Sequence, residues 1–251
     1  MKKSTSWGGV SKWYDELLKD NDSYQAKVIL PNLTRILGDI KGKYVLDLAC
    51  GQGFFSQAFK DLDAHVMGID IAPELIERAR EHVPSMQFHV APAHVIPMVK
   101  SGTQDVVVIT LALQNIKEYR ETIAECARVL MPGGQLTIVL NHPMFRIPKK
   151  THWEWDEEKK IQYRRVDSYM SESAHEIDMH PGEQKKKQVT VSFHRPLQVY
   201  VKALLKEGFL ISGIEEWISH KKSEKGPRQK AEDVARKEIP LFMAISAKRE
   251  G

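Results

Sequence analysis

The sequence predicts an α/β fold in which a doubly wound sheet is covered by helices. Two observations predict this class. Apolar runs of strand length alternate with helical patterns between residues 43 and 140, as expected of repeated strand, helix, strand units. The run KYVLDLACGQGF at 43–54 also places an apolar strand directly before a glycine turn and a helix. With 251 residues, 42% of them hydrophobic, the chain suffices for a single domain over 1–251 with an insertion.

The glycine turn at 51–53 is the element around which the other expectations are arranged. Val45, Leu46 and Leu48 form the apolar strand before it, and glycine lets the backbone turn sharply without Cβ clashes. Residues 54–60 carry apolar side chains three and four positions apart, which predicts a helix whose N-terminal amides face the turn. The turn is therefore expected to cradle a ligand.

Two carboxylates flank this cradle and distinguish between two classes of cofactor. Asp70 ends the strand at 65–70, where an acid can accept hydrogen bonds from both hydroxyls of an adenosine ribose. A dinucleotide fingerprint needs a third glycine, and this chain has Ser56 there. Asp47, four residues before Gly51, would repel a pyrophosphate but can reach the ammonium of a zwitterionic ligand through water. The pair favours a zwitterionic adenosyl ligand.

The pattern D-x-x-x-G-x-G followed by a strand-end acid resembles motif I and its partner in class I S-adenosylmethionine-dependent methyltransferases. ARVLMPGGQLTIV at 127–139 resembles the corresponding helix, turn and strand of small-molecule methyltransferases, and the match runs from residue 7 to about residue 140. The resemblance implies a seven-stranded, Rossmann-like sheet with an antiparallel last strand, and S-adenosyl-L-methionine as cofactor. It places the cofactor contacts at Tyr14, Asp47, Ala49, Gly51, Gly53, Asp70, Ile71, Ala93, His94, Leu111 and Gln114.

Helices are expected before the first strand. Residues 11–18 form a capped amphipathic pattern, and 24–37 predicts one or two more helices with Pro31 at a kink or restart. By resemblance, the helices of 1–42 cover the cofactor edge of the sheet. Tyr14 would then close over the cofactor or the substrate, while burial against the sheet is the alternative for such aromatic residues.

The remaining elements follow in order. We expect helices at 72–81, 119–130 and 197–206, and strands at 86–91, 105–113, 135–140, 210–217 and 241–247, the last two joined by a mobile basic loop. Pro92 stands where related methyltransferases commonly place an acid that binds the adenine amino group. Backbone at Ala93 and His94, or the His94 side chain, must then make this contact. Gln114 and Asn115 follow the central strand and should lie at the ligand crevice.

The segment 142–194 is not needed by the minimal fold and is expected to be an inserted substrate lid. Alternating residues at 169–179 and 188–193 flank a Pro-Gly turn and predict a β-hairpin. HPMFRIP, YRRVDSY, MHPG and FHRPL resemble a widespread bacterial group of uncharacterised class I methyltransferases, which implies no substrate. A homodimer contact is the alternative role for exposed aromatic residues here. Substrate contacts are expected from Asn115, Arg146, Trp153 and Arg195, with a structural ion pair as the alternative for Arg195.

The chemistry of such an enzyme demands alignment more than a fixed set of catalytic groups. Methyl transfer from a sulfonium is an in-line displacement in which the protein orients the nucleophile and excludes water. A base helps when the nucleophile is a hydroxyl or a protonated amine. His142 is the first candidate, because it follows a strand end and histidine titrates near neutral pH, and His194 is the second. No group of acids and histidines has metal-ligand spacing, so no metal is expected.

Composition narrows the choice of partner and compartment. The net charge of +4 lies largely in lysine-rich runs that do not alternate with aromatics, so solvated loops are favoured over an RNA-binding surface. The sequence contains neither an apolar run of 18 residues nor the apolar core of a signal peptide, which predicts a cytoplasmic protein without membrane contact. Two cysteines provide no zinc site and no disulfide framework.

A methyltransferase acting on a small molecule is the leading hypothesis. An RNA or protein methyltransferase on the same core is second, and it would have a basic rim and salt-sensitive affinity. A nicotinamide-dependent oxidoreductase and a cofactor-binding module without catalysis are the remaining alternatives.

Overall fold

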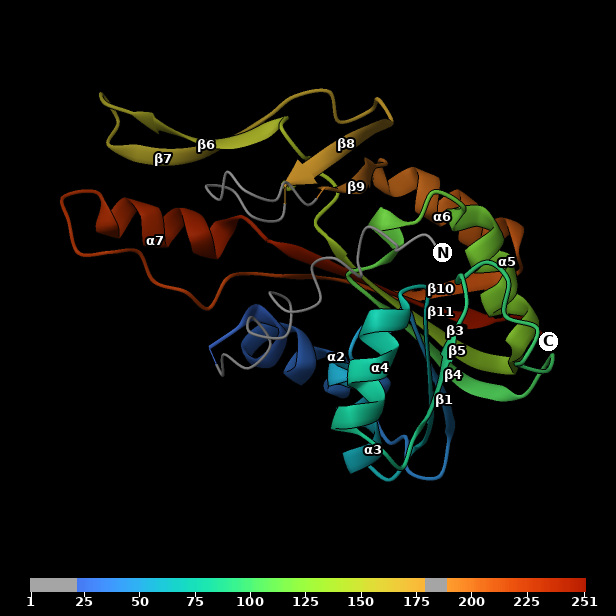
Figure 1. Cartoon of the computed structure of the whole chain (residues 1–251). Coiled ribbons are helices and arrows are strands. Elements are labelled where there is room, and N and C mark those ends of the chain that lie inside the picture. The colour runs from blue at the N-terminus through green and yellow to red at the C-terminus, as the bar shows by residue number, and fades with distance from the viewer. Residues whose placement is uncertain (1–21, 179–188) are drawn as a thin grey trace.

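The computed structural model describes residues 22–178 and 189–251, and its main sheet has seven strands (Figure 1). The strand order is β10, β11, β5, β4, β1, β2, β3. β11 is antiparallel to both of its neighbours, and the other adjacent pairs are parallel. The predicted Rossmann-like sheet with an antiparallel last strand is therefore confirmed. Its strands are β1 (Tyr44–Leu48), β2 (His65–Asp70), β3 (Gln87–Val90), β4 (Gln104–Thr110), β5 (Leu130–Asn141), β10 (Phe209–Trp217) and β11 (Phe242–Arg249).

The central strands are apolar on both sides because both faces of the sheet are covered. In β4, Val107 and Ile109 join one core cluster, while Val106 and Val108 join the other. Successive side chains of a strand point to opposite faces, so a continuous apolar run is what a doubly covered strand requires. This explains why DVVVIT could be recognised as a central strand from its composition.

The helices divide between the two faces (Figure 1). α2 and α3 pack on the face of Val106 and Val108, whereas α5 and α6 pack on the face of Val107 and Ile109. Within the described residues, no helix is both long and apolar enough to cross a lipid bilayer. The helices are η2 (Gln25–Ile29), α2 (Leu30–Leu37), α3 (Phe54–Asp61), α4 (Pro73–His82), η3 (Leu113–Asn115), α5 (Tyr119–Val129), α6 (Leu197–Lys206) and α7 (Gln229–Glu238).

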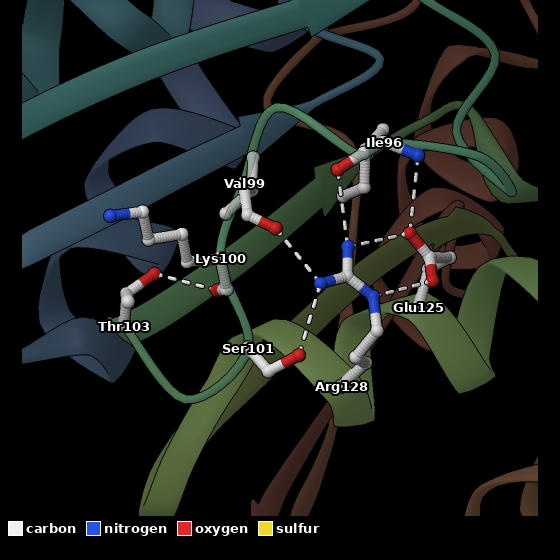
Figure 2. A network of polar contacts seen from close by, with 7 residues as sticks. All are labelled: Ile96, Val99, Lys100, Ser101, Thr103, Glu125 and Arg128. Carbon is white, nitrogen blue, oxygen red and sulfur yellow. Dashed lines mark hydrogen bonds and ion pairs between the residues drawn. The ribbon is translucent and has the colours of Figure 1, made fainter.

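Residues 91–103 connect β3 to β4 as an irregular loop, and α5 holds this loop in place (Figure 2). Arg128 on α5 donates hydrogen bonds to the carbonyls of Val99 and Ile96 at 2.8 and 3.1 Å. Glu125 accepts from the Ile96 N–H at 3.1 Å and pairs with Arg128 at 2.7 Å. The Arg128 guanidinium lowers the pKa of Glu125, so the pair stays charged at neutral pH. The clamp fixes the loop whose first residues line the cavity described below.

Two β-hairpins follow β5 before α6. β8 (Ser173–Asp178) pairs antiparallel with β9 (Val189–His194), as the alternating pattern predicted, and the Pro-Gly turn at 180–182 lies outside the described residues. The other hairpin, β6 (Thr151–Asp156) with β7 (Ile161–Val166), was not predicted. Its strands are only half-buried, so their apolar pattern is weak.

The connection between β10 and β11 differs from the expected mobile loop. Residues 229–238 form α7, which packs beside β7 (Figure 1). Nearly all of its residues are good helix formers, and it buries Ala235. Because QKAEDVARKE is rich in charged residues, the sequence did not indicate this helix, which contacts β7 of the insertion.

Candidate active site

A cavity of about 780 Å³ opens at the carboxyl ends of the parallel strands. Its walls come from the turn after β1, the end of β2, the loops after β3 and β4, the residues after β5, and the β8–β9 hairpin. Ligands of open α/β sheets bind at this edge. The described part of the insertion therefore lies over the same crevice as the glycine turn.

The turn after β1 has the backbone that the glycines were expected to provide. Ala49, Gly51 and Gly53 all have positive φ angles, of 61°, 57° and 83°. The positive φ of Gly53 favours glycine, and a Cβ there would also lie only 3.1 Å from the Phe88 ring. Ala49 and Gly51 line the cavity, while Gly53 does not and instead caps the N-terminus of α3.

Asp70 ties the end of β2 to this turn. Its Oδ2 accepts a hydrogen bond from the Gly51 N–H and its Oδ1 from the Ala72 N–H, both at 2.9 Å. Burial raises the pKa of Asp70, against the effect of these hydrogen bonds. Asp70 lines the cavity, and each carboxylate oxygen retains a lone pair with which to accept a ligand hydroxyl.

Asp47 is the second carboxylate of the cavity and is 1% exposed. The Ser56 hydroxyl donates to its Oδ2 at 2.5 Å. Burial raises the pKa of Asp47 to about 7, and the nearby charge of Asp70 acts in the same direction. Within the described residues, no cation forms an ion pair with Asp47. A buried acid without a counter-charge fits a ligand that brings a cation.

The loops after β3 and β4 form a further part of the cavity wall. Ala93 and His94, which were expected to contact an adenine, line the cavity. Gln114 donates from Nε2 to the Leu111 carbonyl at 2.8 Å, and its Oε1 is buried without a hydrogen-bond partner among the described residues. Thr110 Oγ1 is likewise buried without a hydrogen-bond partner among the described residues, and Thr110 and Gln114 both line the cavity. These oxygens are available to a ligand donor.

The structure gathers most of the residues expected to bind ligands. Tyr14 lies outside the described residues. Three expected contacts, Gly53, Trp153 and Arg195, do not line the cavity. Those that do are Asp47, Ala49, Gly51, Asp70, Ile71, Ala93, His94, Leu111, Gln114, Asn115 and Arg146.

The two histidines expected to act as bases do not line the cavity. His142 Nδ1 accepts from the Met144 N–H at 3.2 Å, which leaves its Nε2–H to donate to Glu216 at 2.6 Å. Burial lowers the pKa of His142, so the ring is neutral at pH 7. His194 donates from Nε2 to the Tyr169 carbonyl at 2.7 Å. Both rings hold structural hydrogen bonds, and the base role stays a prediction without support from their positions.

Arg195 has a structural role other than the expected ligand contact or ion pair. It is 4% exposed and donates to the carbonyls of Leu113, Ile116 and Lys117 at 3.3, 2.9 and 3.3 Å. Its guanidinium also lies 4.2 Å from the centre of the Tyr119 ring. Arg195 thus holds η3, the turn that carries Gln114 and Asn115.

Sequence reasoning missed several residues of the site, and Ser56, Thr110 and Arg164 are three of them. Ser56 was considered only as a missing glycine, although its hydroxyl bonds Asp47. Thr110, at the end of β4, could have been found by the strand-end rule that found Gln114. Arg164 lies in the YRRVDSY motif of the expected lid, but no ligand contact was predicted for it. It lines the cavity from β7, whose hairpin the sequence did not predict.

Comparison with known proteins agrees with this geometry. Residues 46–138 match the family model described as a methyltransferase domain. A solved S-adenosylmethionine dependent methyltransferase from Mesorhizobium loti superposes with a TM-score of 0.70, at 25% identity, over 87% of this chain and 96% of that one. The chain therefore contains a class I S-adenosylmethionine-dependent methyltransferase domain.

Two relatives of known name share the core of this domain. A ubiquinone biosynthesis O-methyltransferase of Aromatoleum aromaticum is 33% identical over 101 residues, which cover 39% of this chain and 43% of the relative. A demethylmenaquinone methyltransferase of Renibacterium salmoninarum is 30% identical over 110 residues, 43% of this chain and 46% of the relative. The chain thus matches less than half the length of either relative.

Proposed function

We propose that this protein transfers a methyl group from S-adenosylmethionine to a small-molecule acceptor bound in the cavity. The observation that carries the proposal is the position of two buried carboxylates, Asp47 and Asp70, at one glycine turn in the wall of a cavity of about 780 Å³. The methyltransferase domain supports the cofactor class. The names of the relatives, which refer to ubiquinone biosynthesis and demethylmenaquinone, support an acceptor of small size.

The residues present fit this cofactor. Asp70 would hold the ribose hydroxyls and Asp47 the amino group, while the unpartnered oxygens of Thr110 and Gln114 remain as acceptors. When bound, the cofactor supplies a methyl carbon activated by a sulfonium. The chain itself contributes a rigid turn, because Asp70 fixes Gly51.

We infer that the insertion 142–194 is a substrate lid, because residues from its described part line the cavity. Thr190 and Ser192 on β9 and Arg164 on β7 line the cavity together with Asn141 and Arg146. Residues from two hairpins therefore surround the space beside the cofactor turn, where they orient an acceptor and exclude water. Orientation of this kind accounts for roughly 7 to 11 kcal/mol of a reaction barrier. Because His142 and His194 do not line the cavity, the mechanism relies mainly on aligning the acceptor with the methyl group.

Calorimetric titration with S-adenosylmethionine and with NAD tests the cofactor. Wild type is compared with Asp70→Ala and with the control Glu81→Gln, an exposed carboxylate outside the cavity. We expect binding of the sulfonium to wild type and to the control, and its loss in Asp70→Ala. Binding of NAD with no response to the sulfonium would overturn the proposal.

A screen of acceptors for formation of demethylated cofactor then tests transfer. RNA and protein are included as substrates at 50 and 300 mM salt. Methylation of RNA with a rate that falls steeply between these salt concentrations would replace the small-molecule proposal with the alternative on the same core.

A further inference from the structure

Two arginines line the cavity on the side of the inserted segment. Arg146 follows β5 by five residues, and Arg164 lies in the middle of β7. Both are partly buried. Burial lowers the pKa of Arg146, and the like charge of Arg164 acts in the same direction. Burial also lowers the pKa of Arg164. Two positive charges are therefore held near each other in a poorly solvated wall.

Neither arginine meets a carboxylate within residues 22–178 and 189–251. Arg146 makes no side-chain hydrogen bond there, and its guanidinium lies 5.5 Å from the centre of the Phe242 ring. Arg164 donates to the Phe145 carbonyl at 3.0 Å and to Thr151 Oγ1 at 2.9 Å, and it stacks over Trp153 at 5.1 Å. These neutral partners orient the Arg164 guanidinium without neutralising it.

Arg128 is also partly buried, and it differs from these two arginines because it meets the carboxylate of Glu125 at 2.7 Å. Glu118 lines the same cavity as the two arginines, yet no ion pair joins it to either of them in the described structure. A desolvated cation is costly unless it is paired. In a ligand cavity, an anionic ligand can supply the counter-charge that the described residues do not.

The sheet order separates Arg146 from Asp47 and Asp70. Asp47 and Asp70 belong to β1 and β2, whereas Arg146 follows β5, on the other side of β4. The cavity thus has an acidic wall that suits an ammonium group and a basic wall that suits an anion. Arginine presents a planar fork that matches a carboxylate or a phosphate with two parallel hydrogen bonds.

We propose that the methyl acceptor carries an anionic group, a carboxylate or a phosphate, that Arg146 and Arg164 bind on the β5 side of the cavity. This inference rests on the proposed function. It names the chemical class of the acceptor, in which one end is anionic and the other presents the nucleophile toward the cofactor turn. Trp153, expected to contact the substrate, acts instead by supporting Arg164.

Ligand-observed NMR on the full chain saturated with S-adenosylhomocysteine tests this proposal. The probes are benzoate, phenyl phosphate and neutral benzamide, applied to wild type, Arg146→Gln, Arg146→Lys and Arg164→Gln. The matched control is Arg120→Gln, an exposed arginine that does not line the cavity. The two anionic probes decide between a carboxylate and a phosphate site.

We expect at least one anionic probe to bind wild type at least tenfold more tightly than benzamide. Arg146→Gln should remove this preference, Arg146→Lys should restore only part of it, and the control should keep it. Affinity for S-adenosylhomocysteine should stay within about twofold in every variant, which also shows that each variant is folded. Equal binding of anionic and neutral probes by wild type, or an unchanged preference in both Gln variants, would overturn the proposal. Loss of cofactor binding by wild type would instead reject the proposed function.

Discussion

The raised pKa of Asp47 predicts that the affinity for S-adenosylmethionine depends on pH. Its pKa is raised to about 7 by burial, so the carboxyl group is largely protonated at pH 5.5 in the cofactor-free protein. A ligand ammonium favours the ionised form, so affinity must rise with pH until the group has titrated. With a pKa of 7, about one molecule in 30 is ionised at pH 5.5 and about half at pH 7, which predicts a gain of roughly 15-fold, or about 1.6 kcal/mol.

Calorimetry with S-adenosylmethionine between pH 5.5 and 7 measures this gain. Repeating the titration at pH 6 in buffers of different ionisation heat counts the proton released, which should be close to one. Asp47→Asn should bind more weakly and show no such gain, while Asp70→Asn tests whether the raised pKa of the second acid contributes. Constant wild-type affinity over this range, with no proton released, would refute the coupling between Asp47 and the ligand cation.

Four further substitutions have outcomes that the structure predicts. Asp47→Asn should stabilise the cofactor-free protein at pH 8 but not at pH 4. Burial raises the pKa of Asp47 from its ordinary value of 3.8 to about 7, so the ionised acid destabilises the folded protein by up to about 4 kcal/mol. Equal melting temperatures of the variant and wild type at pH 8 would contradict this. Arg195→Met should lower the free energy of unfolding in urea by at least about 2 kcal/mol and raise the KM for the cofactor, because η3 loses its hydrogen bonds to Arg195. An unchanged KM would show that the position of η3 does not affect cofactor binding. His142→Ala should cost roughly 1 to 3 kcal/mol and leave the shape of the pH–rate profile unchanged, and loss of one limb would restore the base role. Gly68→Ala would place a Cβ 2.5 Å from Phe88 and should destabilise by roughly 1 to 3 kcal/mol, and wild-type stability would show that the ring can move.

The central sheet could be predicted from the sequence because its signals are local. β1, β2 and β4 are buried on both faces, which leaves apolar runs that composition alone reveals. The strands of the β6–β7 hairpin contain no fully buried residue and α7 buries only Ala235, so their sequences resemble solvated loops. These two elements pack against each other, and neither has a strong pattern of its own.

The two halves of the site differ in the same way. The half proposed to hold the cofactor is built from strand ends and one turn, so the spacing in the sequence could place Asp47, Gly51 and Asp70 together. The half proposed to hold the acceptor includes hairpins whose position depends on tertiary packing. The sequence predicted Arg146 as a substrate contact, and Arg146 lines the cavity, but no such contact was predicted for Arg164.

Arg195 shows why a rule about charge at helix ends failed here. A cation just before α6 is unfavourable for the helix dipole, which suggested an anionic partner, either a ligand or a carboxylate. The structure satisfies the same electrostatic demand with the carbonyls of 113, 116 and 117, whose negative ends converge on the guanidinium. The sequence cannot indicate which backbone carbonyls will contact an arginine, because every residue has a carbonyl. A buried arginine therefore indicates a ligand anion only when its neighbours are known to lack both carboxylates and convergent carbonyls. In the described structure Arg146 meets this stricter condition and Arg195 does not.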